Sequence, residues 1–293
     1  MPSAFSAPGA YQIDFEGSGT LADGNVFTSS GDVTYTFSVP EDVRLDLAAS
    51  ALAAAELAQR AGMPAGVLNV LCADSENSIA IGGVLCASDV VRHLSFTGST
   101  EVGRILARQC APTVKKVSLE LGGNAPFIVF DDADVDAAVE GAMVSKYRNA
   151  GQTCVCSNRL FVQDGVYDAF VKKLVAATAA LTVGDGMQDG ITIGPLVNTR
   201  AVSDVDKLVQ ASIAAGARVA LGGGPHAMGG CFYQPTVLTG VTPDMAVFRN
   251  EIFGPVAPVV RFSTEAEVIA MANDTEFGLA SYFYTRDIGR VWR

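Results

Sequence analysis

Residues 127–162, FIVFDDADVDAAVEGAMVSKYRNAGQTCVCSNRLFV, decide the fold class of this chain. The apolar run FIVF at 127–130 predicts a short strand. Asp134 is the expected N-cap of a helix with acidic residues in its first turn, and this helix is expected to end near Asn149. RLFV at 159–162 predicts a second strand, so the stretch indicates a strand–helix–strand unit of the kind that builds parallel sheets.

The same alternation continues on both sides of this unit. Further helices are expected at 45–60, 101–110, 166–181, 202–217 and 264–274, and further strands at 67–72, 114–121, 218–224, 232–238 and 257–262. Strands that alternate with helices predict an α/β fold with a mostly parallel sheet. Upstream of about residue 47 the chain is rich in Gly, Ser, Thr and Asp instead.

Composition narrows the class of protein. Of 293 residues, 49% are hydrophobic and 17% are charged, which is typical of a folded globular chain. The net charge of −11, with no long basic run, argues against nucleic acid or an anionic membrane as a partner. No apolar run reaches the roughly 18 residues of a membrane helix, and no secretory signal is visible. Six unevenly spaced cysteines form no disulfide framework, so a reduced cytoplasm is the expected compartment.

The segment GQTCVCSNR at 151–159 holds Cys154 and Cys156 on either side of one valine. Four interpretations compete: a metal clip, a redox pair, a structural accident and the site of a nucleophile. Zinc requires four nitrogen or sulfur ligands, and the sequence offers no second pair of cysteines or histidines to complete such a set. A cysteine on a glycine-preceded loop, near an arginine and polar amides, has the setting of an activated thiolate.

Histidine, the usual base for a cysteine nucleophile, is scarce, since the chain contains only His93 and His226. Neither has a carboxylate or a cysteine as a sequence neighbour, so we interpret both as structural. The remaining cysteines are expected to be buried small hydrophobic residues: Cys72, Cys86, Cys110 and Cys231.

LELGGNAP at 119–126 places Glu120 in an apolar strand before two glycines. The carboxyl end of a strand beside an open turn is where α/β proteins place active sites. Partial burial would raise the pKa of this carboxyl toward the range of a general base. The alternative is a carboxylate paired with Lys115 or Lys116.

SFTGSTEVG at 95–103 combines the end of a strand, a Gly–Ser–Thr loop and a helix that opens at Glu101. Backbone N–H groups and the positive end of a helix dipole suit a phosphate at such a place. The alternative is an ordinary helix N-cap, formed by Ser99 or Thr100.

Four motifs taken together resemble one family. FTGSTEVG (96–103), LELGGNAP (119–126), GQTCVCSNR (151–159) and NEIFGPV (250–256) occur in the order and at the spacings of the aldehyde dehydrogenase superfamily. The wider segment KYRNAGQTCVCSNRLFVQ resembles its succinate-semialdehyde dehydrogenase branch.

The resemblance covers residues 48–293. It implies an aldehyde dehydrogenase-like α/β fold, with a partial Rossmann-type dinucleotide-binding domain over 48–121 and a catalytic domain over 122–293. Residues 1–47 match nothing in the family.

The resemblance also implies a chemistry. Cys154 would attack an aldehyde carbon, and Glu120 would activate the water that hydrolyses the resulting thioester, so a carboxylate replaces the missing histidine. Arg148 would bind the carboxylate of succinate semialdehyde, and Cys156 would be a redox partner of the nucleophile.

No metal is implied. The implied cofactor is NAD(P)+, held at its phosphates by Gly98, Ser99, Thr100, Glu101, Val102 and Gly103, and at its nicotinamide ribose and ring by Glu251 and Phe253.

Some family features are missing. A proline–tryptophan–asparagine segment is absent, and with it the asparagine of the oxyanion hole, whose loss typically costs about a hundred- to a thousandfold in rate. The lysine-containing strand that contacts the adenosine ribose is absent too, and the chain stops at Arg293, before the closing segment of the family. We therefore expect a chain truncated at both ends, with weakened homo-oligomer formation. The alternatives to a working dehydrogenase are a catalytically impaired fragment and a thiol-redox protein.

Overall fold

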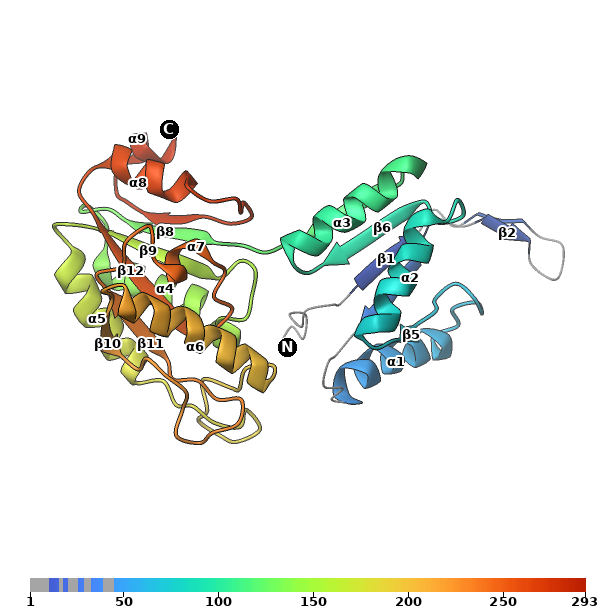
Figure 1. The fold of residues 1–293 in the computed structure, drawn as a ribbon, viewed down its shortest axis with the longest axis horizontal. Coiled ribbons are helices and arrows are strands. Elements are labelled where there is room, and N and C mark those ends of the chain that lie inside the picture. Colours follow the sequence, from blue (N-terminus) through green and yellow to red (C-terminus); the bar gives the residue numbers. More distant parts are fainter. Residues whose placement is uncertain (1–10, 16–17, 21–25, 29–32, 39–44) are drawn as a thin grey trace. The chain divides into compact units, whose positions relative to one another are not determined.

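The structure, a computed structural model, describes residues 11–15, 18–20, 26–28, 33–38 and 45–293. The chain divides into two units (Figure 1): unit 1 ends at Leu121, and unit 2 runs from Gly122 to Arg293.

In its described residues, unit 1 contains small sheets and three α-helices. Its helices are α1 Leu45–Arg60, α2 Ser75–Ala87 and α3 Thr100–Cys110. Its strands are β1 Tyr11–Phe15, β2 Ser18–Thr20, β3 Val26–Thr28, β4 Val33–Ser38, β5 Leu71–Cys72, β6 His93–Thr97 and β7 Lys116–Glu120. The β6–β7 and β4–β5 pairs are parallel, whereas the β1–β4 and β2–β3 pairs are antiparallel.

A small apolar core joins α2, β6 and α3. Its buried members are Cys86, Val91, Leu94, Phe96, Leu106 and Cys110. Two of the expected buried cysteines, Cys86 and Cys110, are confirmed. In contact with Cys110, the Cys86 thiol has a pKa raised to about 12, first by burial and then by this neighbour.

Two features of unit 1 differ from the sequence analysis. The buried strand expected at 67–72 is reduced to Leu71 and Cys72, which are both exposed. In the described part of its sheet, β5 is an end strand that pairs with β4 alone, so little covers these side chains. The helix α2 was not expected, because its apolar residues follow no clear stripe: Ile79 and Val84 are exposed.

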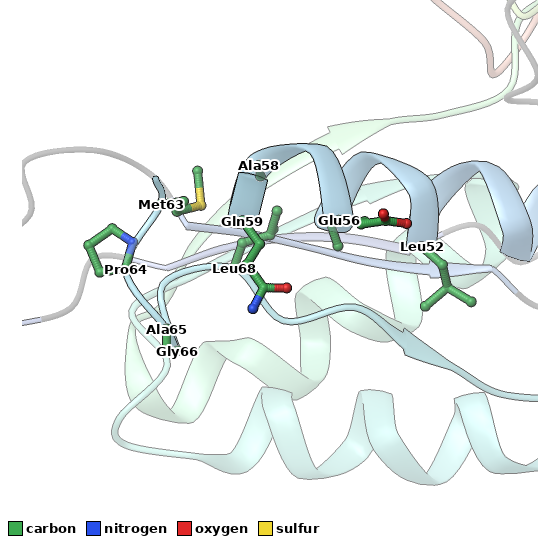
Figure 2. A pocket seen from close by; sticks show the side chains of 10 residues that line it. Leu52, Glu56, Ala58, Gln59, Met63, Pro64, Ala65, Gly66 and Leu68 are labelled. Carbon is green, nitrogen blue, oxygen red and sulfur yellow. The ribbon is translucent and has the colours of Figure 1, made fainter. Parts of the chain in front are cut away.

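Figure 2 shows a hollow between α1 and the turn that follows it. Its lining includes Leu52, Glu56, Gln59, Met63 and Leu68. None of the candidate site residues lies there.

Unit 2 is built on a six-stranded sheet in the order β10-β11-β12-β9-β8-β13. Its strands are β8 Ala125–Val129, β9 Ser157–Gln163, β10 Arg218–Leu221, β11 Thr236–Thr239, β12 Val256–Phe262 and β13 Tyr282–Tyr284. Its helices are α4 Val135–Tyr147, α5 Tyr167–Ala179, α6 Thr199–Ala214, α7 Ala246–Arg249, α8 Glu265–Asn273 and α9 Ile288–Val291. All neighbouring pairs are parallel except β10–β11, so the expected mostly parallel α/β sheet is confirmed.

Helices cover this sheet on both faces. Successive residues of β9, including Leu160, Phe161 and Val162, are fully buried. Because successive side chains of a strand point to opposite faces of the sheet, both faces must be covered. α4 and α5 pack against each other and on β9. As expected, Asp134 caps α4, since its carboxylate accepts hydrogen bonds from the N–H groups of Asp136 and Ala137.

The candidate residues of unit 2 gather at one edge of the sheet. Segments 122–124, 151–156 and 250–255 lead directly into β8, β9 and β12, and Tyr282 opens β13. Because these four strands are parallel neighbours, their amino ends meet at the same edge. The candidate site of unit 2 therefore lies at the amino edge of its sheet.

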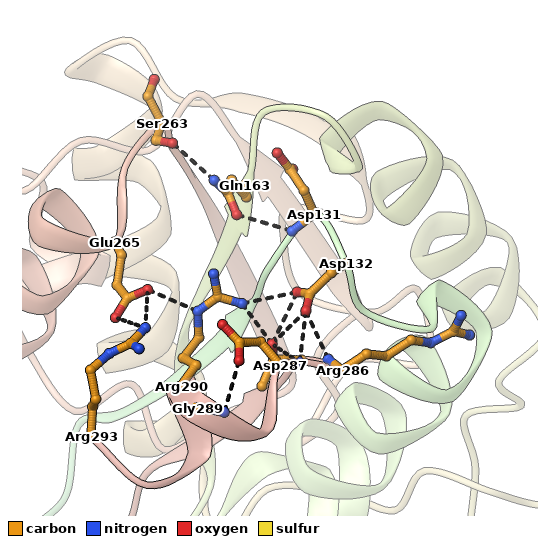
Figure 3. A network of polar contacts seen from close by, with 11 residues as sticks. Asp131, Asp132, Gln163, Ser263, Glu265, Arg286, Asp287, Gly289, Arg290 and Arg293 are labelled. Carbon is orange, nitrogen blue, oxygen red and sulfur yellow. Dashed lines mark hydrogen bonds and ion pairs between the residues drawn. The ribbon is translucent and has the colours of Figure 1, made fainter.

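Hydrogen bonds and ion pairs connect α9 and the residues just before it to the segment between β8 and α4 (Figure 3). The Asp132 carboxylate accepts hydrogen bonds from the Thr285 hydroxyl (2.8 Å), the Arg286 N–H (2.9 Å) and the Arg290 guanidinium (3.0 Å). Arg290 also donates to Glu265 (2.9 Å) and stacks over the Phe130 ring. Burial alone would raise the pKa of Asp132, but these hydrogen bonds and the Arg290 charge outweigh it and lower the pKa.

Asp132→Asn is expected to lower the unfolding temperature by a few degrees at neutral pH, as measured by scanning calorimetry. A carboxyl whose pKa is lower in the folded state stabilises that state above its unfolded pKa, and loses this contribution as the pH falls through the folded pKa. The difference from the native chain should therefore shrink below about pH 3.8, the ordinary value for aspartate. Asp136→Asn is the matched control, because the Asp136–Lys173 pair is exposed and contributes little. An equal loss in both variants would contradict the assignment.

Candidate functional site

The loop before β9 carries the two cysteines. α4 passes into the short 3-10 turn Arg148–Gly151, in which Asn149, Ala150 and Gly151 have φ angles of 57°, 54° and 75°. A Cβ on Gly151 would lie 2.1 Å from the Gly254 carbonyl oxygen, so this position requires glycine. The turn leaves Cys154 partly exposed on the loop.

Gln152 ties the front of this loop to a distant segment. Its side-chain oxygen accepts the N–H of Val197 (2.8 Å), and its amide nitrogen donates to the carbonyls of Asn149 (3.1 Å) and Pro195 (3.3 Å). Gln152 is buried, so these bonds satisfy an amide that water does not reach. The residue two positions before Cys154 is thereby fixed.

The two glycines after β7 bring Cys154 and Glu251 to the same turn. A Cβ on Gly123 would lie 2.0 Å from the Cys154 carbonyl oxygen, and one on Gly122 would lie 2.7 Å from Glu251 Oε2. The Gly123 N–H donates to Glu251 Oε1 (3.0 Å). The role of this glycine pair was not foreseen, and its only sequence signal is the Gly–Gly doublet itself.

Asn158 holds the backbone on both sides of Glu251, another role that sequence reasoning missed. Its amide nitrogen donates to the Asn250 carbonyl (2.8 Å), and its oxygen accepts the Ile252 N–H (3.2 Å). The same nitrogen donates to Asn124 Oδ1 (2.6 Å). A buried asparagine between the cysteines and an apolar strand is the signal that could have indicated it.

Glu251 is a half-buried carboxylate. Burial raises its pKa, while the Gly123 N–H and the charge of Lys146 work in the opposite direction. Phe253, two residues on, has a left-handed backbone (φ 53°) and is partly buried. Of the pair implied by the resemblance, Glu251 therefore contacts the glycine turn that touches Cys154, and Phe253 follows two residues later in the chain.

Two cations come from the end of α4. Arg148 is exposed, and no hydrogen bond or ion pair holds its guanidinium anywhere in the part of the chain that the structure describes. Lys146 is fully buried, and its ammonium has no hydrogen-bond partner among the described residues. Its charge acts on Cys156 and Glu251.

Cys156 is buried and points to carbonyl groups. Its thiol donates to the Lys146 carbonyl (3.5 Å), and burial raises its pKa despite the nearby Lys146 charge. No disulfide joins Cys154 and Cys156; all six cysteines, each within the described ranges, are thiols. Cys231 is only partly buried, so the expectation of burial is wrong for it as well as for Cys72.

In unit 1, the loop at 98–103 opens α3. Ser99 is the N-cap, and its hydroxyl accepts the Val102 N–H (3.3 Å), which settles the alternative between Ser99 and Thr100. A Cβ on Gly103 would lie 2.4 Å from the Leu121 side chain, so this glycine permits α3 to pack closely on the end of β7.

The same loop has features that suit a dinucleotide phosphate. The Thr100 hydroxyl oxygen is buried and has no hydrogen-bond partner among the described residues. It lies in the first turn of an 11-residue helix, where N–H groups also lack intrahelical acceptors. Glu101 belongs to the same turn, whereas the N–H of Val102 is already bonded to the Ser99 hydroxyl. An unsatisfied hydroxyl beside such N–H groups fits the acceptor oxygens of a phosphate.

Glu120 ends β7 in unit 1, and its carbonyl accepts the Gly98 N–H (2.9 Å). Its side chain is exposed, so the expected partial burial is wrong: β7 pairs only with β6 in the described part of the sheet. The alternative of an ion pair is not observed either, because Lys115 donates to the carbonyls of Ser88 and Val91 and no described ion pair includes Glu120.

Within the described ranges, no group of three or more His, Cys, Asp or Glu side chains is placed to hold a metal ion. Among those same residues, no helix is both long enough and apolar enough to span a bilayer.

The fold and the site together define the class of this protein. It is an α/β protein with mostly parallel sheets, in which the loop that carries Cys154 packs against the turn at Gly122 and Gly123. The chain belongs to the aldehyde dehydrogenase family, whose family model matches residues 46–293. The resemblance seen in the four motifs is thereby confirmed.

Known relatives agree with this assignment. Over 244 residues the chain is 61% identical to a glutarate-semialdehyde dehydrogenase of Pseudomonas aeruginosa and 60% identical to a succinate-semialdehyde dehydrogenase [NADP(+)] of Escherichia coli. The crystal structure of succinate-semialdehyde dehydrogenase from Burkholderia pseudomallei matches with a TM-score of 0.81 at 61% identity. Each comparison covers 83% of this chain and 50% of the other protein, so the chain spans about half the length of the relatives it matches.

Proposed function

We propose that this chain oxidises an aldehyde that carries a carboxylate, with Cys154 as the nucleophile and NAD(P)+ as the cofactor. The observation that carries the proposal is the exposed, unengaged Arg148 guanidinium on the loop of the partly exposed Cys154. A guanidinium suits a carboxylate because it can donate two parallel hydrogen bonds. Relatives named for succinate and glutarate semialdehydes support this substrate class.

The residues of the chain would act in sequence. The Cys154 sulfur attacks the aldehyde carbon, so that an S–C bond forms and the carbonyl electron pair moves to oxygen. After oxidation to the thioester, a water molecule attacks the same carbon while Glu120 takes a proton from that water. The S–C bond then breaks, the carboxylate product leaves, and Cys154 returns to its thiol form.

When bound, NAD(P)+ supplies the hydride acceptor for this oxidation. Gly98 to Gly103 would hold its phosphates, as the unsatisfied Thr100 hydroxyl supports. Glu251 would hold the nicotinamide ribose, and Phe253 would lie against the ring. Residues 48–121 would then form the cofactor part and residues 122–293 the catalytic part. The same proposal includes weak association of the chain with copies of itself, which sedimentation velocity would measure.

Arg148→Gln is expected to lower kcat/KM for succinate semialdehyde by about ten- to a hundredfold, since a hydrogen bond to a charged group contributes about 1.5–3 kcal/mol. The rate for butanal, a neutral aldehyde of the same chain length, should change much less. The measurement follows the absorbance of the reduced cofactor with NAD+ and, separately, with NADP+.

Arg218→Gln, at an exposed arginine of the same unit, serves as the matched control. Equal losses for the two aldehydes would overturn the role of Arg148. A flat trace of the native chain with both cofactors, together with a folded circular-dichroism spectrum, would reject the working dehydrogenase in favour of an impaired fragment.

A further inference from the structure

Tyr282 reaches across two strands to the cysteine loop. It opens β13, which pairs with β8, and β8 in turn pairs with β9. The phenolic O–H of Tyr282 donates to the carbonyl oxygen of Val155 at 2.8 Å. Val155 is the residue between Cys154 and Cys156, so this hydrogen bond acts on the Val155–Cys156 peptide, one residue after Cys154.

The bond completes the restraint of the loop. Gln152 fixes the chain before Cys154, and the Cys156 N–H donates to the Thr153 carbonyl (3.1 Å) across a tight turn. No other described hydrogen bond from a distant element reaches the Val155 peptide. Without the Tyr282 hydroxyl, the local bond from the Cys156 N–H to the Thr153 carbonyl is left as the restraint on this peptide, so the turn that carries Cys154 and Cys156 is held less firmly.

The surroundings keep the phenol available as a donor. Burial raises the pKa of Tyr282, and the neighbouring Cys156 adds to the rise while Arg148 opposes it. The hydroxyl therefore keeps its proton at neutral pH. The ring itself is held against Phe127, with the ring centres 6.3 Å apart.

We propose that Tyr282 is a positioning residue for Cys154. Its hydroxyl holds the Val155 peptide in the orientation that presents Cys154 and keeps Cys156 buried on the Lys146 carbonyl. The inference rests on the proposed function in one respect, the assignment of Cys154 as the nucleophile.

The test compares Tyr282→Phe with the full native chain. Iodoacetamide labels accessible thiols, and peptide mass spectrometry gives separate labelling rates for Cys154 and Cys156. The ratio of these two rates is expected to fall by about two- to tenfold in Tyr282→Phe, as expected for the loss of one hydrogen bond of about 0.5–1.5 kcal/mol. Rates at Cys110 and Cys231 serve as internal references, because general loosening of the fold would raise them as well.

Tyr284→Phe is the matched control. Tyr284 lies on the same strand and also packs on Phe127, with ring centres 5.2 Å apart, but its hydroxyl lies against Gly141 of α4. Its labelling ratio should equal that of the native chain. An unchanged ratio in Tyr282→Phe, or an equal fall in Tyr284→Phe, would overturn the proposal.

Labelling needs no turnover, so the outcome is separate from that of the proposed function. A native chain that oxidises no aldehyde but shows the expected shift in Tyr282→Phe would reject the dehydrogenase activity and retain the positioning of the loop. In an active chain, Tyr282→Phe should also lower kcat while KM for the aldehyde stays unchanged. A higher KM with an unchanged kcat would contradict a positioning role.

Discussion

Cys154→Ser is expected to reduce aldehyde oxidation by about four to six orders of magnitude, as replacement of a nucleophile does in other enzymes. A serine hydroxyl is a far weaker nucleophile than a thiolate at neutral pH, and no histidine is proposed to activate it. The measurement is the rate of cofactor reduction with succinate semialdehyde, for the native chain and the variant at equal concentration.

Cys231→Ser is the matched control, because Cys231 is another partly exposed cysteine of unit 2, and its rate should equal that of the native chain. An active Cys154→Ser variant would contradict the assignment of the nucleophile.

Cys156→Ser tests the redox role that the family resemblance implies for Cys156. Peroxide would oxidise the Cys154 thiol to a sulfenic acid with release of water, and condensation with the Cys156 thiol would form a disulfide and a second water. Dithiothreitol would then restore the native chain. Without Cys156 the sulfenic acid proceeds to sulfinic acid, so less activity should return. Equal recovery in both proteins would contradict this role.

Gly123→Ala is expected to lower the unfolding temperature of the chain by several degrees and to slow iodoacetamide labelling at Cys154. The added Cβ would lie 2.0 Å from the Cys154 carbonyl oxygen, so backbone must move. Overpacking of this kind typically costs about 1–3 kcal/mol. The displaced atoms are the carbonyl of Cys154 and, through the Gly123 N–H, the carboxylate of Glu251. Calorimetry and the labelling rate report the two effects.

Gly186→Ala is the matched control, since Gly186 is exposed and its Cβ would meet nothing within 4 Å. It should leave both measurements unchanged. A native-like unfolding temperature and labelling rate in Gly123→Ala would show that the glycine turn is not pressed against the cysteine loop.

Local signals predicted most of the elements of unit 2. Asp134 caps α4 where the sequence places it, and the helix expected from Thr264 begins with a capping box between Thr264 and Glu267. Such signals are reliable because a cap joins residues only two or three positions apart. The same reasoning failed at Glu120, where burial depends on which strands and helices lie alongside β7 and not on the apolar residues next to it in the chain.

The sequence by itself determined the α/β class, the family and the residue types available for chemistry, because these follow from local periodicity and from short motifs. Only the tertiary structure decided that the amino ends of four parallel strands meet, so that Gly123 touches Cys154 and Tyr282 reaches Val155. Tyr282 and Val155 are 127 positions apart. The order of strands in a sheet, which no local pattern encodes, sets such contacts.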